Sequence, residues 1–180
     1  MTKIKFAFLL ILLISTKCFA CLNGETKILK DGTILFADRD YGLPFGHSFN
    51  ESRFDKMISK LDSAYVKTGD LDYLSDKGLV LILQKKYDEA LKLYLEIEKL
   101  EPNRYSTASN IGTIYELIGE NEKALKWINK SIKLNSKAHN GSEWLHSKIL
   151  EAKIKGKQYY NGSFLLNTDF GNDKIPMPSL

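Results

Sequence analysis

Residues 71–104 read LDYLSDKGLVLILQKKYDEALKLYLEIEKLEPNR, and residues 105–138 read YSTASNIGTIYELIGENEKALKWINKSIKLNSKA. Both segments are 34 residues long, and aligning them superimposes identical residues. The matching pairs are Gly78 and Gly112, Ala90 and Ala124, Leu91 and Leu125, Lys92 and Lys126, and Leu100 and Leu134. A repeat of this length is typical of helical arrays in which each unit packs on its neighbours.

Each 34-residue unit contains two stretches of apolar residues at helical spacing around a short break. The break falls at Lys85-Lys86 in the first unit and at Gly119-Glu120 in the second. Four small residues at matching places would let neighbouring helices cross closely: Gly78, Ala90, Gly112 and Ala124. The sequence therefore predicts two helix-turn-helix units, and Pro102 ends the second helix of the first unit.

The repeat resembles the tetratricopeptide repeat (TPR) in length and in its signature positions. The residues that carry the resemblance are Leu74, Gly78, Leu81, Ala90, Tyr94 and Pro102 in the first unit, and Ala108, Ile111, Gly112, Tyr115, Ala124 and Ile128 in the second. The departures are Lys77, Asn121 and Ser136. The resemblance implies an all-α, antiparallel helix-turn-helix solenoid with a right-handed superhelical stack.

Flanking segments extend the helical domain to residues 51–154. Before the repeats, apolar residues recur at helical spacing and predict a helix over 51–68: Phe54, Met57, Ile58, Leu61 and Tyr65. After them, residues 139–154 begin a third unit in the same register. His146 stands there at the close-packing position of Gly112, and its bulk predicts a terminal helix that caps the stack.

The ends of the chain differ from this middle. The arm over residues 21–50 contains a Lys-Asp-Gly turn between two β-prone runs at 26–36, which predicts a short hairpin or an extended arm. Residues 155–180 lack helical periodicity and contain Pro176 and Pro178, so we expect an extended, irregular tail. The tail is also rich in apolar residues, and two alternatives stay open. It fills the groove of the stack, or the repeats form the regulatory N-terminal part of a larger enzyme or transport-associated protein.

Residues 1–20 are typical of a secretory signal peptide, with a basic start, nine apolar residues over Phe6–Ile14, and Cys18-Phe19-Ala20 before the cleavage point. The apolar run is well short of the roughly 20 residues of a membrane span. We expect an exported bacterial protein, periplasmic, envelope-attached or secreted. Cleavage after Ala20 would leave Cys21 at the mature N-terminus, where it resembles a lipid-acceptor cysteine, and a membrane contact is expected only through that lipid.

The composition and motifs favour binding over catalysis. The leader holds three of the 26 basic residues, so 23 remain against 22 acidic ones, and no nucleic-acid partner is expected. The three histidines are far apart in sequence and no nucleophile or phosphate-loop motif occurs. We predict no enzyme activity, no catalytic or metal-binding residues and no cofactor.

The resemblance implies a concave groove lined by the first helix of each repeat, holding a protein or peptide partner. Carried over by register, the lining residues would include Ser75, Leu79, Ile82, Asn110, Thr113 and Glu116, with Asp72, Ser106 and Ser109 beside them. Only Asn110 matches the set with which some relatives clamp a C-terminal carboxylate, so that kind of partner is not expected. The sequence indicates neither the partner's identity nor the oligomeric state.

Trp144 allows two interpretations. In the first, Trp144 and Leu145 bury the last helix while Glu143 and His146 stay at its edge. In the second, Trp144 anchors a partner, because tryptophan is a frequent anchor in interfaces.

Overall fold

The computed structural model describes residues 26–37 and 51–167, and the chain divides into two compact units, Met1–Asn50 and Glu51–Leu180. The predicted signal peptide and Cys21 lie outside the described residues. Within the described residues, no helix has both the length and the apolar character needed to cross a bilayer.

The N-terminal unit contains the predicted hairpin. Strand β1 (Thr26–Ile28) pairs antiparallel with β2 (Ile34–Ala37). The Asp31 carboxylate accepts hydrogen bonds from the Thr33 backbone N–H at 2.9 Å and from the Thr33 hydroxyl at 2.8 Å. Gly32 has φ of +81°, a conformation in which glycine lacks the Cβ penalty of other residues. The Lys-Asp-Gly turn predicted from the sequence is therefore confirmed.

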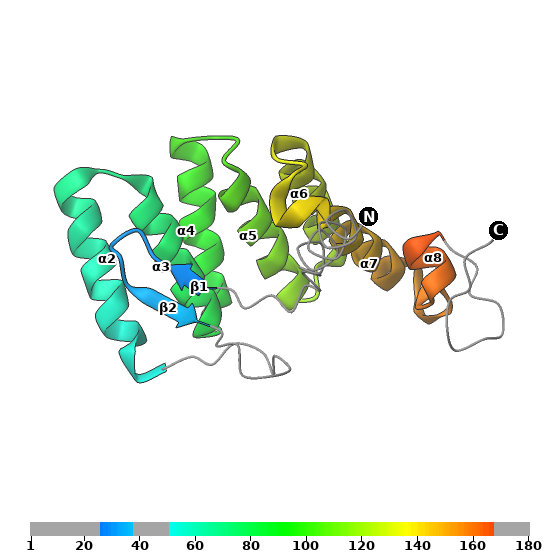
Figure 1. Cartoon of the computed structure of the whole chain (residues 1–180), viewed down its shortest axis with the longest axis horizontal. Helices are drawn as coiled ribbons and strands as arrows, with labels where there is room; N and C mark the ends of the chain where they lie inside the picture. The colour runs from blue at the N-terminus through cyan, green and yellow to red at the C-terminus, as the bar shows by residue number, and fades with distance from the viewer. Residues whose placement is uncertain (1–25, 38–50, 168–180) are drawn as a thin grey trace, which may run out of the picture. The chain divides into compact units, whose positions relative to one another are not determined.

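The second unit is helical, and its helices follow one another in chain order (Figure 1). A 3₁₀ turn η1 (Glu51–Arg53) leads into α2 (Phe54–Thr68), followed by the four repeat helices. These are α3 (Leu71–Leu83), α4 (Tyr87–Leu100), α5 (Tyr105–Leu117) and α6 (Asn121–Leu134). A second 3₁₀ turn, η2 (Ala138–Gly141), precedes α7 (Glu143–Lys155). The prediction of an all-α helical-repeat fold with a short hairpin is confirmed.

The two repeat units turn in the same way between their helices. Lys85 has φ of +60° between α3 and α4, and Gly119, one repeat later, has φ of +84° between α5 and α6. Both residues close the preceding helix, because their backbone N–H groups donate to Ile82 and Glu116 at 2.9 and 3.0 Å. The first unit thus adopts, with a lysine, the left-handed turn that the second makes with a glycine.

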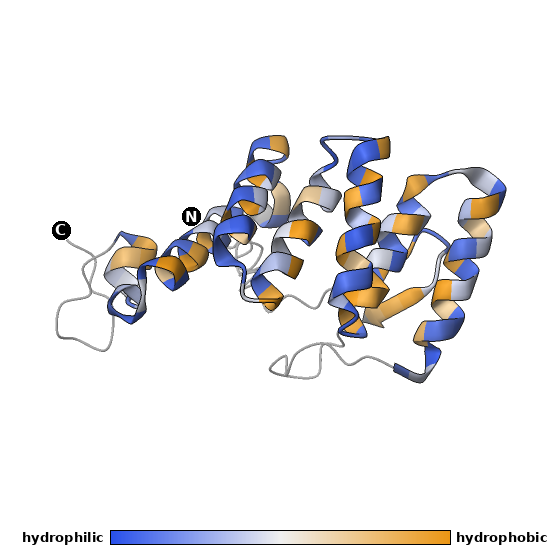
Figure 2. Ribbon diagram, turned by 180° about the vertical axis from the view of Figure 1, so that it is seen from behind, coloured by the Kyte–Doolittle hydropathy of each residue, from blue (hydrophilic) through white to orange (hydrophobic). Residues whose placement is uncertain are grey.

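The core runs along the seams between consecutive helices, and apolar and polar faces alternate around each helix in Figure 2. One cluster of buried residues joins α3, α4 and α5, namely Leu81, Ala90, Tyr94, Ile97, Ile111 and Ile114. A second joins α6 to α7 through Ala124, Ile128 and Leu150. Each large side chain buried in this way contributes roughly 1.5–3 kcal/mol relative to exposure, so these seams hold the stack together.

The flanking helix α2 is fastened to α3 by polar contacts. The Lys77 ammonium lies 2.7 Å from Asp62 Oδ1, and Gln84 Nε2 donates to Asp55 Oδ1 at 2.9 Å. Lys77 replaces the leucine that is usual in the repeat, and the ion pair with α2 gives this departure a structural role.

The C-terminal end differs from the extended tail expected over 155–180. Gly156 ends α7, a 3₁₀ turn η3 (Lys157–Tyr159) follows, and α8 (Gly162–Leu166) returns against α7. The Asn161 side chain caps α8 by accepting from the Phe164 N–H at 2.9 Å. Within the described residues, the third unit therefore has a full first helix and a five-residue second one. Residues 168–180 lie outside the described residues.

Candidate partner-binding surface

Tyr94 joins three helices beneath the predicted groove. Its hydroxyl donates to the Ser75 carbonyl at 2.6 Å and accepts from Asn110 Nδ2 at 2.8 Å. The side chain is fully buried, and this burial raises the pKa of the Tyr94 hydroxyl well above its ordinary value. Ser75 is itself buried, so Ser75 and Asn110, both predicted as groove residues, help to hold α3, α4 and α5 together.

Arg104 connects the two repeats at the start of α5. Its guanidinium forms ion pairs with Asp72 of α3 and, at 2.7 Å, with Glu101. Burial alone would lower the pKa of Arg104, but hydrogen bonds to Glu101 and Asp72 outweigh it and raise the pKa. These contacts fix the first turn of α5 relative to that of α3.

Glu116 forms a cluster with two basic side chains of α7. One carboxylate oxygen lies 2.6 Å from His146 Nε2, and the other lies 2.5 Å from Lys153 Nζ. Burial raises the pKa of Glu116, but the hydrogen bonds from Lys153 and His146 outweigh it, and the pKa falls below its ordinary value of 4.5. The Glu116 carboxylate is therefore engaged in contacts within the chain, and these contacts connect the end of α5 to α7.

The structure reverses the burial that the first interpretation predicts for Glu143 and Trp144. Glu143 is only 8% exposed and accepts a hydrogen bond from the Tyr105 hydroxyl at 2.9 Å, whereas Trp144 is 47% exposed. Burial, followed by the hydrogen bond to Glu143, raises the pKa of Tyr105 to about 12. The expectation that Trp144 buries the last helix while Glu143 stays at its edge is wrong.

Trp144 also lies apart from the other predicted groove residues. Successive helix residues are about 100° apart, so Trp144 and His146 point to nearly opposite sides of α7. His146 faces α5 through Glu116. The exposed Trp144 indole is therefore not part of the surface that the other predicted groove residues form.

The remaining predicted residues are Leu79, Ile82 and Thr113. Ile82 packs against the core cluster of α3, α4 and α5. Leu79 and Thr113 are partly buried and occupy the same place in consecutive repeats, 34 residues apart. The structure thus brings the predicted groove residues onto consecutive first helices, but Ser75, Asn110 and Glu116 are engaged in contacts within the chain.

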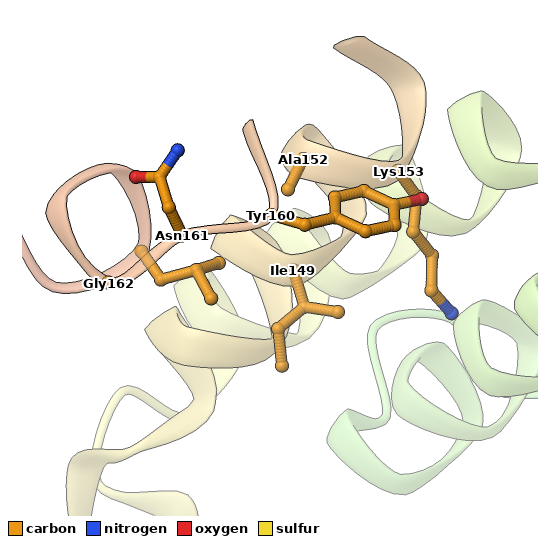
Figure 3. A pocket seen from close by; sticks show the side chains of 7 residues that line it. Ile149, Ala152, Lys153, Tyr160, Asn161 and Gly162 are labelled. Atoms are coloured by element: carbon orange, nitrogen blue, oxygen red, sulfur yellow. The ribbon is translucent and has the colours of Figure 1, made fainter. Parts of the chain in front are cut away.

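A pocket between α7 and the segment that follows it was missed by sequence reasoning (Figure 3). Its volume is about 310 Å³, and it is lined by Ile149, Ala152, Lys153, Tyr160, Asn161, Gly162 and Leu165. Lys153 belongs both to this pocket and to the Glu116 cluster, so the pocket adjoins the contact between α5 and α7. The apolar residues of the C-terminal segment were the only sequence signal for it.

Aromatic and cationic side chains hold α8 against α7. The Phe164 ring lies 5.1 Å from the Tyr159 ring, centroid to centroid, in an edge-to-face arrangement. Lys148 and Lys155 of α7 place their ammonium groups 5.2 and 4.8 Å from the Phe164 centroid, within the range of cation–π attraction. These contacts hold α8, which forms the side of the pocket opposite α7, against α7.

The described residues contain no group of three or more histidine, cysteine, aspartate or glutamate side chains placed to hold a metal ion.

Comparison with known proteins gives a match to the tetratricopeptide repeat family over residues 105–137. No curated protein matches the chain. Repeats of this family are, in general, protein–protein interaction modules. Residues 105–137, which contain α5 and α6, therefore form a tetratricopeptide repeat, and α3 and α4 precede them in the same 34-residue register.

Proposed function

We propose that this chain is an exported bacterial interaction module that holds an extended segment of a protein partner along α3 and α5. The observation that carries the proposal is the equivalence of Leu79 and Thr113. These two side chains lie one repeat apart on consecutive first helices, and both keep part of their surface exposed. An extended segment can contact both in succession.

The surroundings of this pair favour a rigid binding surface. Tyr94 fixes the backbone of α3 at Ser75 and the side chain of Asn110 on α5, while Arg104 joins the starts of the same two helices. A surface fixed before binding loses less conformational entropy when a partner arrives. The internal hydrogen bonds of Ser75 and Asn110 thus support binding indirectly, by positioning Leu79 and Thr113.

The same contacts limit which chemical groups of a partner can bind at this surface. Asn110, the one residue that matches a carboxylate clamp, already donates its amide to Tyr94, and the Glu116 carboxylate already contacts His146 and Lys153. Leu79 offers an apolar contact and Thr113 a neutral polar one. We therefore propose a partner segment that binds through an apolar residue beside Leu79 and backbone or hydroxyl contacts near Thr113.

Affinity capture from envelope extract, using the mature chain and two variants, tests this proposal. The double variant Leu79→Asp, Thr113→Arg should lose the captured partner by about tenfold or more, because an aspartate cannot replace the apolar contact. Leu100→Asp, at a 64% exposed leucine at the end of α4, should capture it as well as wild type does. Circular dichroism would establish that all three proteins are folded. Equal capture by the double variant and wild type would contradict the proposed surface.

Export and lipidation form a separate part of the proposal, supported by the apolar run Phe6–Ile14 and by the position of Cys21 after Ala20. The intact mass of the protein recovered from the producing cell should correspond to a chain that begins at Cys21. A lipid on Cys21 should add the mass of its acyl chains, and Cys21→Ser should release the protein from the membrane fraction. Recovery of a chain that still begins at Met1 would contradict export by this route.

A further inference from the structure

The last helix pair in the described residues is incomplete. α7 takes the place of a first helix, but its second helix is the five-residue α8, which covers α7 only in part. Two of the apolar side chains that line the pocket stay exposed, Ile149 at 36% and Tyr160 at 56%, and Leu166 at the end of α8 is 45% exposed. Terminal repeats normally present a polar outer face, so we expect another segment to cover these exposed apolar side chains.

The chain itself supplies a segment at this place. α8 ends at Leu166, and residues 168–180, TDFGNDKIPMPSL, begin two residues later along the chain. The segment carries four large apolar residues, Phe170, Ile175, Met177 and Leu180. Ile175 is eight residues beyond Asn167, a span of up to about 28 Å when extended, so the pocket is within reach.

Charge and local chain geometry favour the same occupant. The segment carries Asp169 and Asp173 against one lysine, Lys174, so it is acidic overall, and Asp173 lies just before the anchors Ile175 and Met177. Four lysines lie along α7 and just after it: Lys148, Lys153, Lys155 and Lys157. Pro176 and Pro178 disfavour a helix, and a proline favours an extended conformation in the residue before it, here Ile175 and Met177. A tethered segment also has an effective concentration in the millimolar range, so even weak docking is well populated.

We propose that residues 168–180 dock in the pocket between α7 and α8, with Ile175 and Met177 as apolar anchors, and complete the last layer of the stack. A pocket of about 310 Å³ is at the lower limit of small-molecule sites and suits one or two side chains. The proposal does not depend on the partner surface, because the anchors contact α7 and α8 and leave Leu79 and Thr113 free.

Photo-cross-linking within the full mature chain tests the docking. Benzoylphenylalanine replaces either Tyr160, which lines the pocket, or Trp144, an exposed aromatic residue on another side of α7. Position 160 should give intramolecular cross-links to residues 168–180, and position 144 should not. The double variant Ile175→Asp, Met177→Asp should lower the yield by about tenfold, because the tether is unchanged while the apolar anchors are lost.

A matched pair on α7 separates docking from simple proximity in sequence. Ile149 and Ile154 are 36% and 37% exposed, but only Ile149 lines the pocket. Ile149→Asp should therefore reduce the cross-link from position 160, and Ile154→Asp should leave it unchanged. Two results would overturn the proposal: a yield insensitive to the anchor variant, or products that link two chains and rise with protein concentration.

Discussion

A Cβ atom added to Gly78 would lie 2.5 Å from Cε2 of the Tyr94 ring. That distance is far below van der Waals contact, so α3 and α4 are as close at this crossing as a glycine allows. The hydroxyl of the same ring bonds to Ser75 and Asn110, so the tyrosine cannot move aside without breaking these contacts. Gly78 and Tyr94 therefore set the spacing of the first repeat together.

Gly78→Ala should lower the free energy of unfolding by about 2 kcal/mol, because the cost of overpacking exceeds the helix propensity gained from alanine. Gly112→Ala is the matched control in the second repeat. Its new Cβ would meet Ile128 Cδ1 at 2.6 Å and the Ile128 backbone N at 3.1 Å. The first atom is the end of a flexible side chain and the second needs to move only slightly, so the cost should be smaller than at Gly78. Denaturant unfolding measures both values, and a neutral Gly78→Ala would show that the crossing is loose.

Tyr94→Phe should keep the packing of the ring but destabilise the protein by about 1–3 kcal/mol, because the Ser75 carbonyl and the Asn110 amide lose a buried partner. The cycle of Tyr94→Phe, Asn110→Ala and the double variant isolates the contact between the two side chains. We expect a coupling energy of about 0.5–3 kcal/mol. Strict additivity of the two single effects would argue that Asn110 and Tyr94 act independently.

Lys85→Gly should stabilise the chain by about 0.5–1 kcal/mol. Lys85 has φ of +60°, which penalises a residue with a Cβ, and Gly119 already fills the equivalent place in the second repeat. The neighbouring Lys86 has φ of −83°, so Lys86→Gly should bring no gain. Thermal unfolding of the two variants compares them directly, and equal shifts in Tm would contradict the role of the left-handed turn.

Glu116→Gln should destabilise the protein by about 1 kcal/mol near pH 6, a partly exposed pair being weakened by solvent. Because the folded-state pKa of Glu116 is below 4.5, its contribution is complete above that value and is lost as pH falls through the folded pKa. The difference between wild type and Glu116→Gln should thus shrink between about pH 5 and pH 3. The exposed Glu122 provides a control, Glu122→Gln, and a constant difference for Glu116→Gln over this range would contradict the cluster.

The repeat and its turns could be predicted from the sequence because they depend on local features. The register of Gly78 and Gly112 marks the close crossings, and the Lys-Asp-Gly turn marks the hairpin. The orientation of α7 could not be predicted in this way. Both sides of this helix carry apolar residues, and Glu143 is buried through a hydrogen bond to Tyr105, 38 residues earlier. Trp144 is exposed as a consequence.

The candidate site was accessible to sequence reasoning only in outline. The register placed Ser75, Asn110 and Glu116 on consecutive first helices, but their hydrogen bonds to Tyr94, His146 and Lys153 depend on how the helices pack. The short α8 gives no periodic signal, since five residues make little more than one turn. Its contacts with Lys148 and Lys155, and the pocket that results, come from tertiary structure.

The central claim, that the exposed parts of Leu79 and Thr113 form one partner-binding surface, is tested most directly by photo-cross-linking in the producing cell. Benzoylphenylalanine would be placed at position 79, 113 or 100 in otherwise wild-type protein. The account predicts that positions 79 and 113 cross-link to the same protein partner and that position 100, at the end of α4, does not. Cross-linking of that partner from position 100 alone, or equally from all three positions, would contradict it.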